Sequence, residues 1–230
     1  MELVTYERVG RAARIRMDDG RLNLMNPAML SALDAAFDRA AADGVIAVLS
    51  GRPDIFSAGF DLKVFRSGDA AASKALVRQG AELALKVLSF PRPVVTATEG
   101  HAYPMGAFLM LSADWRIGAD SGWKGGLNEV AIGLTVPSFA LELARQRLAP
   151  AWFSRTAITG ELFLARDAIE AGLIDELVPV GGVETAVEAA IARLSTIDFG
   201  AHAATKRRAR RGAIAAVRAA IDAELLPEPA

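Results

Sequence analysis

The sequence predicts an α/β fold, and three features of its pattern indicate this class. Short, continuously apolar segments such as residues 45–49 are typical of strands buried on both faces. Longer segments place apolar side chains three and four positions apart, as amphipathic helices do. The two kinds of segment alternate along the chain, which is typical of βαβ units.

The first elements carry the clearest signals. Residues 3–9 and 12–17 have the alternating pattern of β-strands, which predicts an antiparallel hairpin. A helix is predicted next, from Pro27 to about residue 43, because Asn26 is a suitable N-cap and proline is favoured at the first helical position. Gly44 is expected to end this helix.

The remaining elements continue the alternation, and the last of them is predicted as one long helix over residues 203–225. The other predicted helices are 71–88, 106–112, 139–147, 150–158, 165–171 and 183–194, and the other predicted strands are 93–98, 116–117 and 174–180.

Composition excludes several classes of protein. The 230 residues hold 26 Lys and Arg against 27 Asp and Glu, and this balance argues against a nucleic-acid partner. With no cysteine and two histidines, disulfides and thiolate-bound metals are excluded and no metal site is expected. No apolar run reaches the roughly 18 residues of a membrane span, and the start lacks the pattern of a secretory signal. We therefore expect a soluble, cytoplasmic protein with no membrane partner.

Common nucleotide and hydrolase signatures are absent from the chain. There is no G-x-G-x-x-G, no G-x-x-x-x-G-K-[ST] and no G-x-S-x-G. A basic run over residues 206–211 has two open interpretations. It is either the solvated face of the last helix or a contact for an anionic group such as a phosphate.

Three segments combine small residues with groups suited to catalysis. Residues 56–63, Phe-Ser-Ala-Gly-Phe-Asp-Leu-Lys, and residues 100–108 each follow a predicted strand, and free backbone N–H groups there can bind an oxyanion. In residues 125–133, Glu129 is the only acid in an apolar, glycine-rich stretch. A carboxyl group with apolar neighbours has a raised pKa and can act as a base near neutrality. Taken alone, each segment is also compatible with an ordinary loop, and Glu129 with a surface residue.

Taken in order, these segments and one further stretch resemble the crotonase superfamily, also called the enoyl-CoA hydratase/isomerase family. Residues 56–63 resemble its first oxyanion motif, and residues 100–117, which end in Asp-Trp-Arg-Ile, resemble the second. Residues 126–133, Gly-Leu-Asn-Glu-Val-Ala-Ile-Gly, resemble its catalytic-acid segment. Residues 168–178 resemble its later A-x-x-x-G-L-V-D-x-V-V stretch, so the likeness covers nearly the whole chain.

The resemblance implies a fold, an assembly and a substrate class. The fold would be a crotonase-like spiral of ββα units over residues 1–195, followed by a C-terminal helical trimerisation region over residues 196–230. The assembly would be a homotrimer or a hexamer. The substrate would be a coenzyme A thioester, with no tightly bound cofactor.

The resemblance also implies roles for particular residues. The backbone N–H groups of Phe60 and Met105 are expected to form an oxyanion hole for a thioester enolate, with Glu129 as the catalytic acid/base. Lys206 or Arg207 is a candidate contact for the CoA 3′-phosphate. The residues expected to contact substrate are Asn23, Ala58, Asp61, Lys63, Phe108 and Asn128. His101 and Tyr103 are expected to be packing residues.

One departure from the family pattern bears on the reaction. The family's hydratases carry a first catalytic Glu six residues before the Asp of the second motif, and Phe108 stands there in this chain. A single Glu suits a reaction that takes a proton from C2 of a 3-enoyl thioester and returns it at C4. The prediction is a Δ3,Δ2-enoyl-CoA isomerase with Glu129 as the proton shuttle. The alternatives are an enoyl-CoA hydratase, another thioester-enolate reaction such as hydrolysis or decarboxylation, or a catalytically silent acyl-CoA-binding protein.

Overall fold

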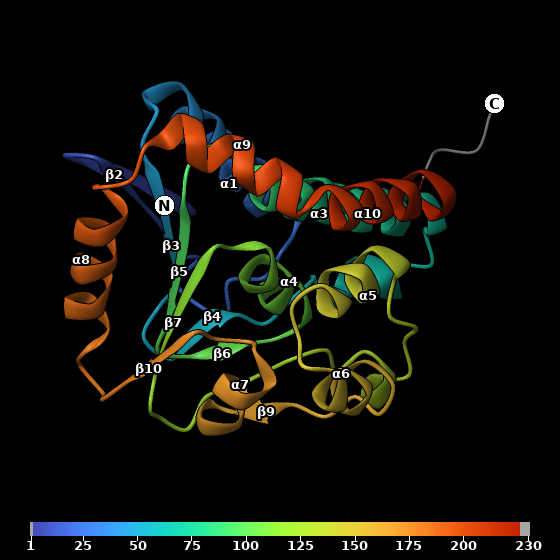
Figure 1. The fold of residues 1–230 in the computed structure, drawn as a ribbon. Helices are drawn as coiled ribbons and strands as arrows, with labels where there is room; N and C mark the ends of the chain where they lie inside the picture. Colours follow the sequence, from blue (N-terminus) through green and yellow to red (C-terminus); the bar gives the residue numbers. More distant parts are fainter. Residues whose placement is uncertain (1, 226–230) are drawn as a thin grey trace.

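A computed structural model describes residues 2–225, and the fold is organised around two sheets (Figure 1). The first strand pair is antiparallel, and the other pairs of the larger sheet are parallel. The larger sheet has the order β1 (Val4–Val9), β2 (Ala12–Met17), β3 (Ile46–Ser50), β5 (Val94–Thr98), β7 (Trp115–Ala119) and β10 (Glu176–Val178). The smaller sheet has the order β4 (Ile55–Ser57), β6 (His101–Ala102), β8 (Lys124–Gly125) and β9 (Phe163–Leu164).

Helices cover both faces of the larger sheet, and a separate cluster of buried apolar side chains lies on each face. Helix α8 packs on one face, over a small core centred on Ile46, Val95 and Ile117. Helix α1 lies on the other face, where its apolar side chains and those of α3 and α4 build the main core. The helices are α1 (Pro27–Asp43), α2 (Leu62–Arg66), α3 (Ala70–Ser89), α4 (Pro104–Ser112), α5 (Ser138–Arg145), α6 (Pro150–Ala157), α7 (Ala165–Ala171), α8 (Val183–Leu194), α9 (Phe199–Ala209) and α10 (Arg211–Glu224). Within residues 2–225, no helix is both long enough and apolar enough to cross a membrane.

The N-terminal elements confirm the sequence prediction closely. Strands β1 and β2 pair with Val4 opposite Met17, as an antiparallel hairpin requires. The Asn26 side chain accepts a hydrogen bond of 2.9 Å from the Met29 N–H, and helix α1 ends at Gly44 in a left-handed conformation. Local capping chemistry alone therefore set both ends of this helix.

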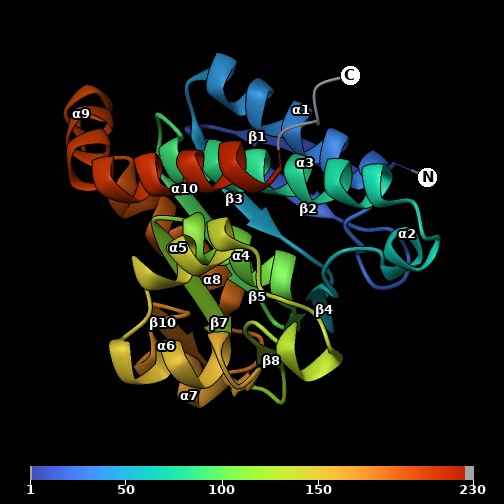
Figure 2. The ribbon, with the colours of Figure 1, turned by 90° about the vertical axis from the view of Figure 1, so that its right-hand side faces the viewer.

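The C-terminal helix prediction was wrong, because the predicted single helix is broken at Arg210. Its guanidinium donates hydrogen bonds of 3.0–3.1 Å to the carbonyl oxygens of Leu88, Ser112 and Ala113. The chain bends at Arg210, so that α9 and α10 run in different directions (Figure 2). Helix α10 packs against α3 and α5. Residues 226–230 of the predicted C-terminal region lie outside the described residues, and the division at residue 195 stays a prediction.

A buried ion pair fastens strand β10 to strand β7. The Arg116 side chain is 1% exposed and forms two hydrogen bonds, of 2.9 and 2.7 Å, with the Asp175 carboxylate. Arg116 also donates to the carbonyl oxygen of Gly172, and Arg147 adds a second cation beside Asp175. Burial opposes the charge on Asp175, but the hydrogen bonds and charge of Arg116 and the charge of Arg147 outweigh it and hold the pKa of Asp175 below its usual range.

We expect Asp175→Asn to lower the free energy of unfolding by roughly 3 kcal/mol at pH 7, since it leaves the Arg116 charge buried without its counter-ion. The pKa of Asp175 is lower when folded than when unfolded. The stabilisation is therefore full above the ordinary carboxyl pKa and is lost as the pH falls through the lowered value. Urea unfolding across pH measures both effects. Asp38→Asn is the control, because the Asp38–Lys86 pair is exposed and worth less than about 1 kcal/mol. Equal losses in the two variants would contradict the prediction.

Candidate active site

The loop after β4 presents the Phe60 N–H as a free donor. The Gly59 carbonyl accepts from the Met25 N–H at 2.9 Å, and the Asp61 N–H donates to the Met25 carbonyl at 3.3 Å. Because backbone groups alternate in direction along an extended segment, the Phe60 N–H between them points away from Met25. Within residues 2–225 it donates to no protein acceptor. Gly59 has φ +86°, a left-handed conformation that favours glycine.

The start of α4 presents a second free donor, the Met105 N–H. Pro104 is the first residue of this helix and Met105 the second, so the Met105 N–H has no intrahelical partner. No other acceptor for it lies within the described part of the chain. The Tyr103 N–H donates to the Ser57 carbonyl at 2.9 Å, which ties the start of α4 to the loop after β4.

The two donor loops lie against each other. A Cβ atom built on Gly59 would lie 3.6 Å from the Pro104 nitrogen and 3.7 Å from the Met105 nitrogen. Any larger side chain at residue 59 would enter the space beside the Met105 N–H. The geometry therefore brings together the two backbone amides that the sequence predicted as an oxyanion hole, and the role itself remains a proposal.

Glu129 is a buried carboxyl group at the start of the short 3-10 helix Val130–Ile132. Its side chain is 7% exposed, and its buried Oε2 has no hydrogen-bond partner within residues 2–225. Burial raises the pKa of Glu129 from 4.5 to about 7, and a backbone hydrogen bond opposes the rise only in part. A carboxyl group with this pKa is present near neutrality in both its acid and its base forms.

A cavity of about 280 Å³ is lined by both Phe60 and Glu129. Met105 is fully buried and does not belong to the lining, but its neighbour Pro104 does. The cavity is mostly apolar, and Glu129 is its only ionisable carboxyl group among the described residues. The residues that line it are Ala58, Gly59, Phe60, Leu62, Phe65, Val77, Tyr103, Pro104, Asn128, Glu129, Ile132, Leu134, Thr135 and Pro137. A site with one acid, two free N–H groups and apolar walls is suited to moving a proton on a substrate that develops charge on an oxygen.

The predicted substrate contacts divide into those in the cavity and those outside it. Ala58 and Asn128 line the cavity, and their contact with substrate stays a prediction. Asp61 instead caps the start of α2, where its carboxylate accepts from the Lys63 N–H at 3.0 Å. Lys63 is exposed, and neither Asp61 nor Lys63 belongs to the cavity lining.

Two predicted contacts lie outside the cavity and pack within the protein. The Asn23 side chain is fully buried and donates to the carbonyl oxygens of Met17 and Phe56 at 3.1 and 3.2 Å, so it holds the loop together and is not free to meet a ligand. Phe108 is also fully buried, and its ring packs edge-on against Phe139 at 5.5 Å. Phe108 lies outside the cavity lining, because α4 turns this side chain into the core.

Two further side chains differ from their expected places. Tyr103, expected to pack, lines the cavity at the N-cap position of α4, and nothing in the sequence around it indicates this. Lys206, a candidate phosphate contact, is 4% exposed and forms a 2.7 Å ion pair with Asp114. Burial lowers the pKa of Lys206 to about 8 although Asp114 opposes the fall. Arg207 remains exposed.

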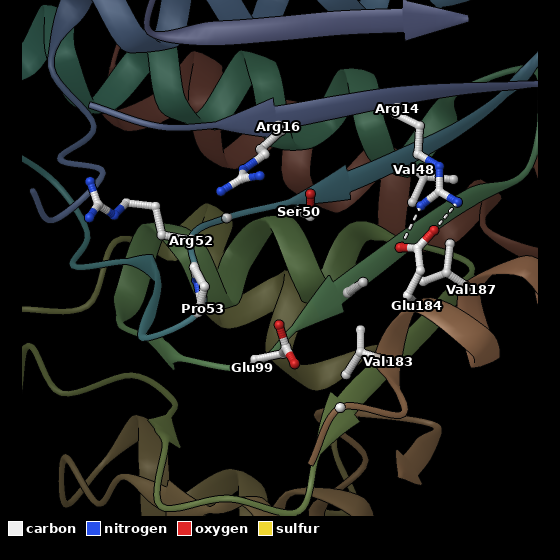
Figure 3. Close-up of a pocket in the computed structure, with 13 residues that line it drawn as sticks. Arg14, Arg16, Val48, Ser50, Arg52, Pro53, Glu99, Val183, Glu184 and Val187 are labelled. Atoms are coloured by element: carbon white, nitrogen blue, oxygen red, sulfur yellow. Dashed lines mark hydrogen bonds and ion pairs between the residues drawn. The ribbon is translucent and has the colours of Figure 1, made fainter. Parts of the chain in front are cut away.

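A second hollow, of about 220 Å³, lies between the larger sheet and α8 and has a different character (Figure 3). Two of its arginines form short ion pairs. Arg14 pairs with Glu184 at 2.6 Å across the opening, and Arg52 pairs with Asp18 at 3.0 Å. It shares no lining residue with the cavity that holds Glu129.

Comparison with known proteins agrees with the fold. The chain matches the family described as enoyl-CoA hydratase/isomerase over residues 7–225. A solved structure of an enoyl-CoA hydratase/isomerase family protein from Pseudomonas syringae is 40% identical, with a TM-score of 0.94 over 97% of this chain and 98% of that one. A probable enoyl-CoA hydratase of Mycobacterium avium is 33% identical over 64% of this chain and 57% of that protein. Human mitochondrial enoyl-CoA delta isomerase 1 is 30% identical over 73% of this chain and 56% of that protein.

The fold thus defines a protein of the crotonase class. The chain belongs to the enoyl-CoA hydratase/isomerase family. Its match to the curated relatives spans less than two thirds of their length, and they include both hydratases and isomerases.

We expect Glu129→Gln to stabilise the fold at alkaline pH. The folded-state pKa of about 7 lies above the ordinary 4.5, so the unfolded chain releases this proton first, and stability falls as pH rises through that window. The full cost above pH 7 is about 3 kcal/mol, and glutamine does not incur it. Urea unfolding should give nearly equal stabilities at pH 4 and a more stable variant at pH 8. The control is Glu170→Gln on the exposed face of α7. A Glu129→Gln variant with no gain at pH 8 would contradict the assignment of a raised pKa.

Proposed function

We propose that the protein is a Δ3,Δ2-enoyl-CoA isomerase, acting on a coenzyme A thioester without a tightly bound cofactor. The observation that carries this proposal is the single buried carboxyl group of Glu129, with a pKa of about 7, in an apolar cavity beside two free backbone N–H groups. A base that takes up and returns one proton needs no second acid. The similarity to the human delta isomerase supports the same reading.

The proton transfer runs between two carbon atoms of one substrate. The ionised Glu129 removes a proton from C2 of the 3-enoyl thioester, and the electrons of the C2–H bond delocalise as a dienolate onto the thioester oxygen. The protonated Glu129 then returns the proton to C4, the double bond moves to C2–C3, and the carboxylate is regenerated. A pKa near 7 suits both steps, since neither protonation state is strongly favoured at neutral pH.

The negative charge of the intermediate needs donors that are already in place. The N–H groups of Phe60 and Met105 have no competing acceptor within residues 2–225 and would both point to the thioester oxygen. Preorganised donors of this kind typically contribute about 3–4 kcal/mol each to the transition state. Side chains at these two positions can vary without removing the donors.

The surroundings of Glu129 argue against hydration. A hydratase has to activate water and manage its protons, for which the family's hydratases use a second Glu. Phe108 stands at that sequence position here and lies outside the cavity lining, buried against Phe139. No other carboxyl group among the described residues lines the cavity.

The proposal predicts that purified protein converts 3-hexenoyl-CoA to the conjugated 2-enoyl thioester, measured as a rise in absorbance at the enoyl thioester band. Glu129→Gln should lose at least about 100-fold in rate, because the amide cannot take the proton. The exposed Glu170→Gln variant should keep the wild-type rate.

The same assay can also give results that would contradict the proposal. An absorbance fall with 2-hexenoyl-CoA, and no rise with 3-hexenoyl-CoA, would identify a hydratase. An active Glu129→Gln enzyme would exclude the proton shuttle. Binding of hexanoyl-CoA without turnover of either enoyl substrate would favour a silent acyl-CoA-binding protein.

We also propose that the working form is a homotrimer or a hexamer. Val130, Ile132 and Leu134 at the cavity rim are 43%, 50% and 38% exposed, and a second copy of the chain would shield such an apolar rim from water. Light scattering should give a mass three or six times the 24.3 kDa of one chain. A mass of one chain at micromolar concentration would refute this assembly.

A further inference from the structure

Gly80 on helix α3 is in close contact with the side chains of Phe60 and Met105. A Cβ atom built on Gly80 would lie 2.6 Å from Cζ of Phe60 and 2.9 Å from Sδ of Met105. Both distances are well below the roughly 3.5–4.0 Å at which carbon atoms pack. Gly80 is therefore a small-residue notch in α3 that receives both side chains.

The two side chains in this notch belong to the residues whose N–H groups form the candidate oxyanion hole. The Phe60 ring also lines the cavity, where it packs edge-on against Phe65 at 6.2 Å. Val77, one helical turn before Gly80 on the same side of α3, lines the cavity as well. The Phe60 ring thus lies between the notch and the cavity.

We propose that Gly80 is a positioning residue that sets the depth of the acyl cavity. This inference rests on the proposed function, because it takes the apolar cavity to hold the acyl chain of the thioester. With Gly80, the Phe60 ring withdraws toward α3 and leaves the cavity open to longer acyl chains. A side chain at residue 80 would push the ring into the cavity and displace the loop that carries the Phe60 N–H.

Helix chemistry gives no other reason for glycine at this place. Glycine is a poorer helix former than alanine, and Gly80 lies in the middle of the 20-residue helix α3. Gly212 in helix α10 provides the contrast, because a Cβ atom built on it meets nothing within 4 Å. The same Gly→Ala change is therefore open at residue 212 and blocked at residue 80.

The test compares Gly80→Ala with its matched control Gly212→Ala. Calorimetry measures the affinities for hexanoyl-CoA and decanoyl-CoA, and the absorbance assay measures kcat/KM for 3-hexenoyl-CoA and 3-decenoyl-CoA. In Gly80→Ala, both decanoyl-to-hexanoyl ratios should fall by roughly tenfold or more, since a lost methylene site in an apolar pocket commonly costs that much. Gly212→Ala should keep the wild-type ratios. Gly80→Ala/Phe60→Leu should recover the long-chain ratios, because the smaller side chain relieves the contact.

A Gly80→Ala variant with unchanged ratios would overturn the proposal, as would a double variant that stays as selective for short chains as Gly80→Ala. If Gly80→Ala does not fold, Phe60→Leu alone decides, because it deepens the cavity and should raise the decanoyl ratios. An unchanged ratio in that variant would also overturn the proposal. Wild-type protein that binds both saturated thioesters and isomerises neither enoyl substrate would refute the proposed reaction, while the binding ratios would still test Gly80.

Discussion

The buried pairing of Arg116 with Asp175 is the interaction on which the placement of the second half of the molecule depends. It joins β7, in the middle of the chain, to the segment before β10, about 60 residues later. Through the carbonyl of Gly172 it also fixes the end of α7, and through Arg147 the region that follows α5. This charge pair therefore fixes β10, the end of α7 and the region after α5 relative to β7.

Buried charge serves two opposite purposes in this protein. Outside the cavity, two buried cations have counter-ions: Lys206 pairs with Asp114, and Arg116 pairs with Asp175. In the cavity, the Glu129 carboxyl has burial without a counter-ion. Pairing with Arg116 holds the pKa of Asp175 below its usual range, whereas isolation moves the titration of Glu129 to neutrality. Burial opposes the charged form of both carboxyl groups. Opposite charges offset this effect at Asp175 but not at Glu129.

Local signals explain what could be predicted from the sequence. The ends of α1, the β1–β2 hairpin and the placing of most helices follow from capping residues and apolar periodicity, which act over a few positions. The juxtaposition of Phe60, Met105 and Glu129 followed from a likeness to a family, because three short motifs far apart in sequence do not show by themselves that they meet. The short strands of the smaller sheet gave no period long enough to recognise.

Tertiary contacts explain what could not be predicted. The break at Arg210 depends on hydrogen bonds to carbonyl groups of two other helices. The sequence around Arg210 does not indicate these contacts. Asn23 was expected to face substrate, but three backbone carbonyls surround its amide. Whether Phe108 or Tyr103 borders the cavity depends on how α4 is rotated, and this short helix is apolar on every side.

The position of Arg210 has an electrostatic consequence for α4. The aligned peptide dipoles of a helix place partial positive charge at its amino end and partial negative charge at its carboxyl end. The amino end of α4 holds the Met105 N–H, and the carboxyl end holds the Ser112 and Ala113 carbonyls, to which Arg210 donates. The guanidinium, which also pairs with Asp114 at 3.0 Å, lies against the negative pole of the helix and offsets part of its charge. Arg210, between the two C-terminal helices, thereby acts on the far end of a helix whose first residue, Pro104, lines the cavity.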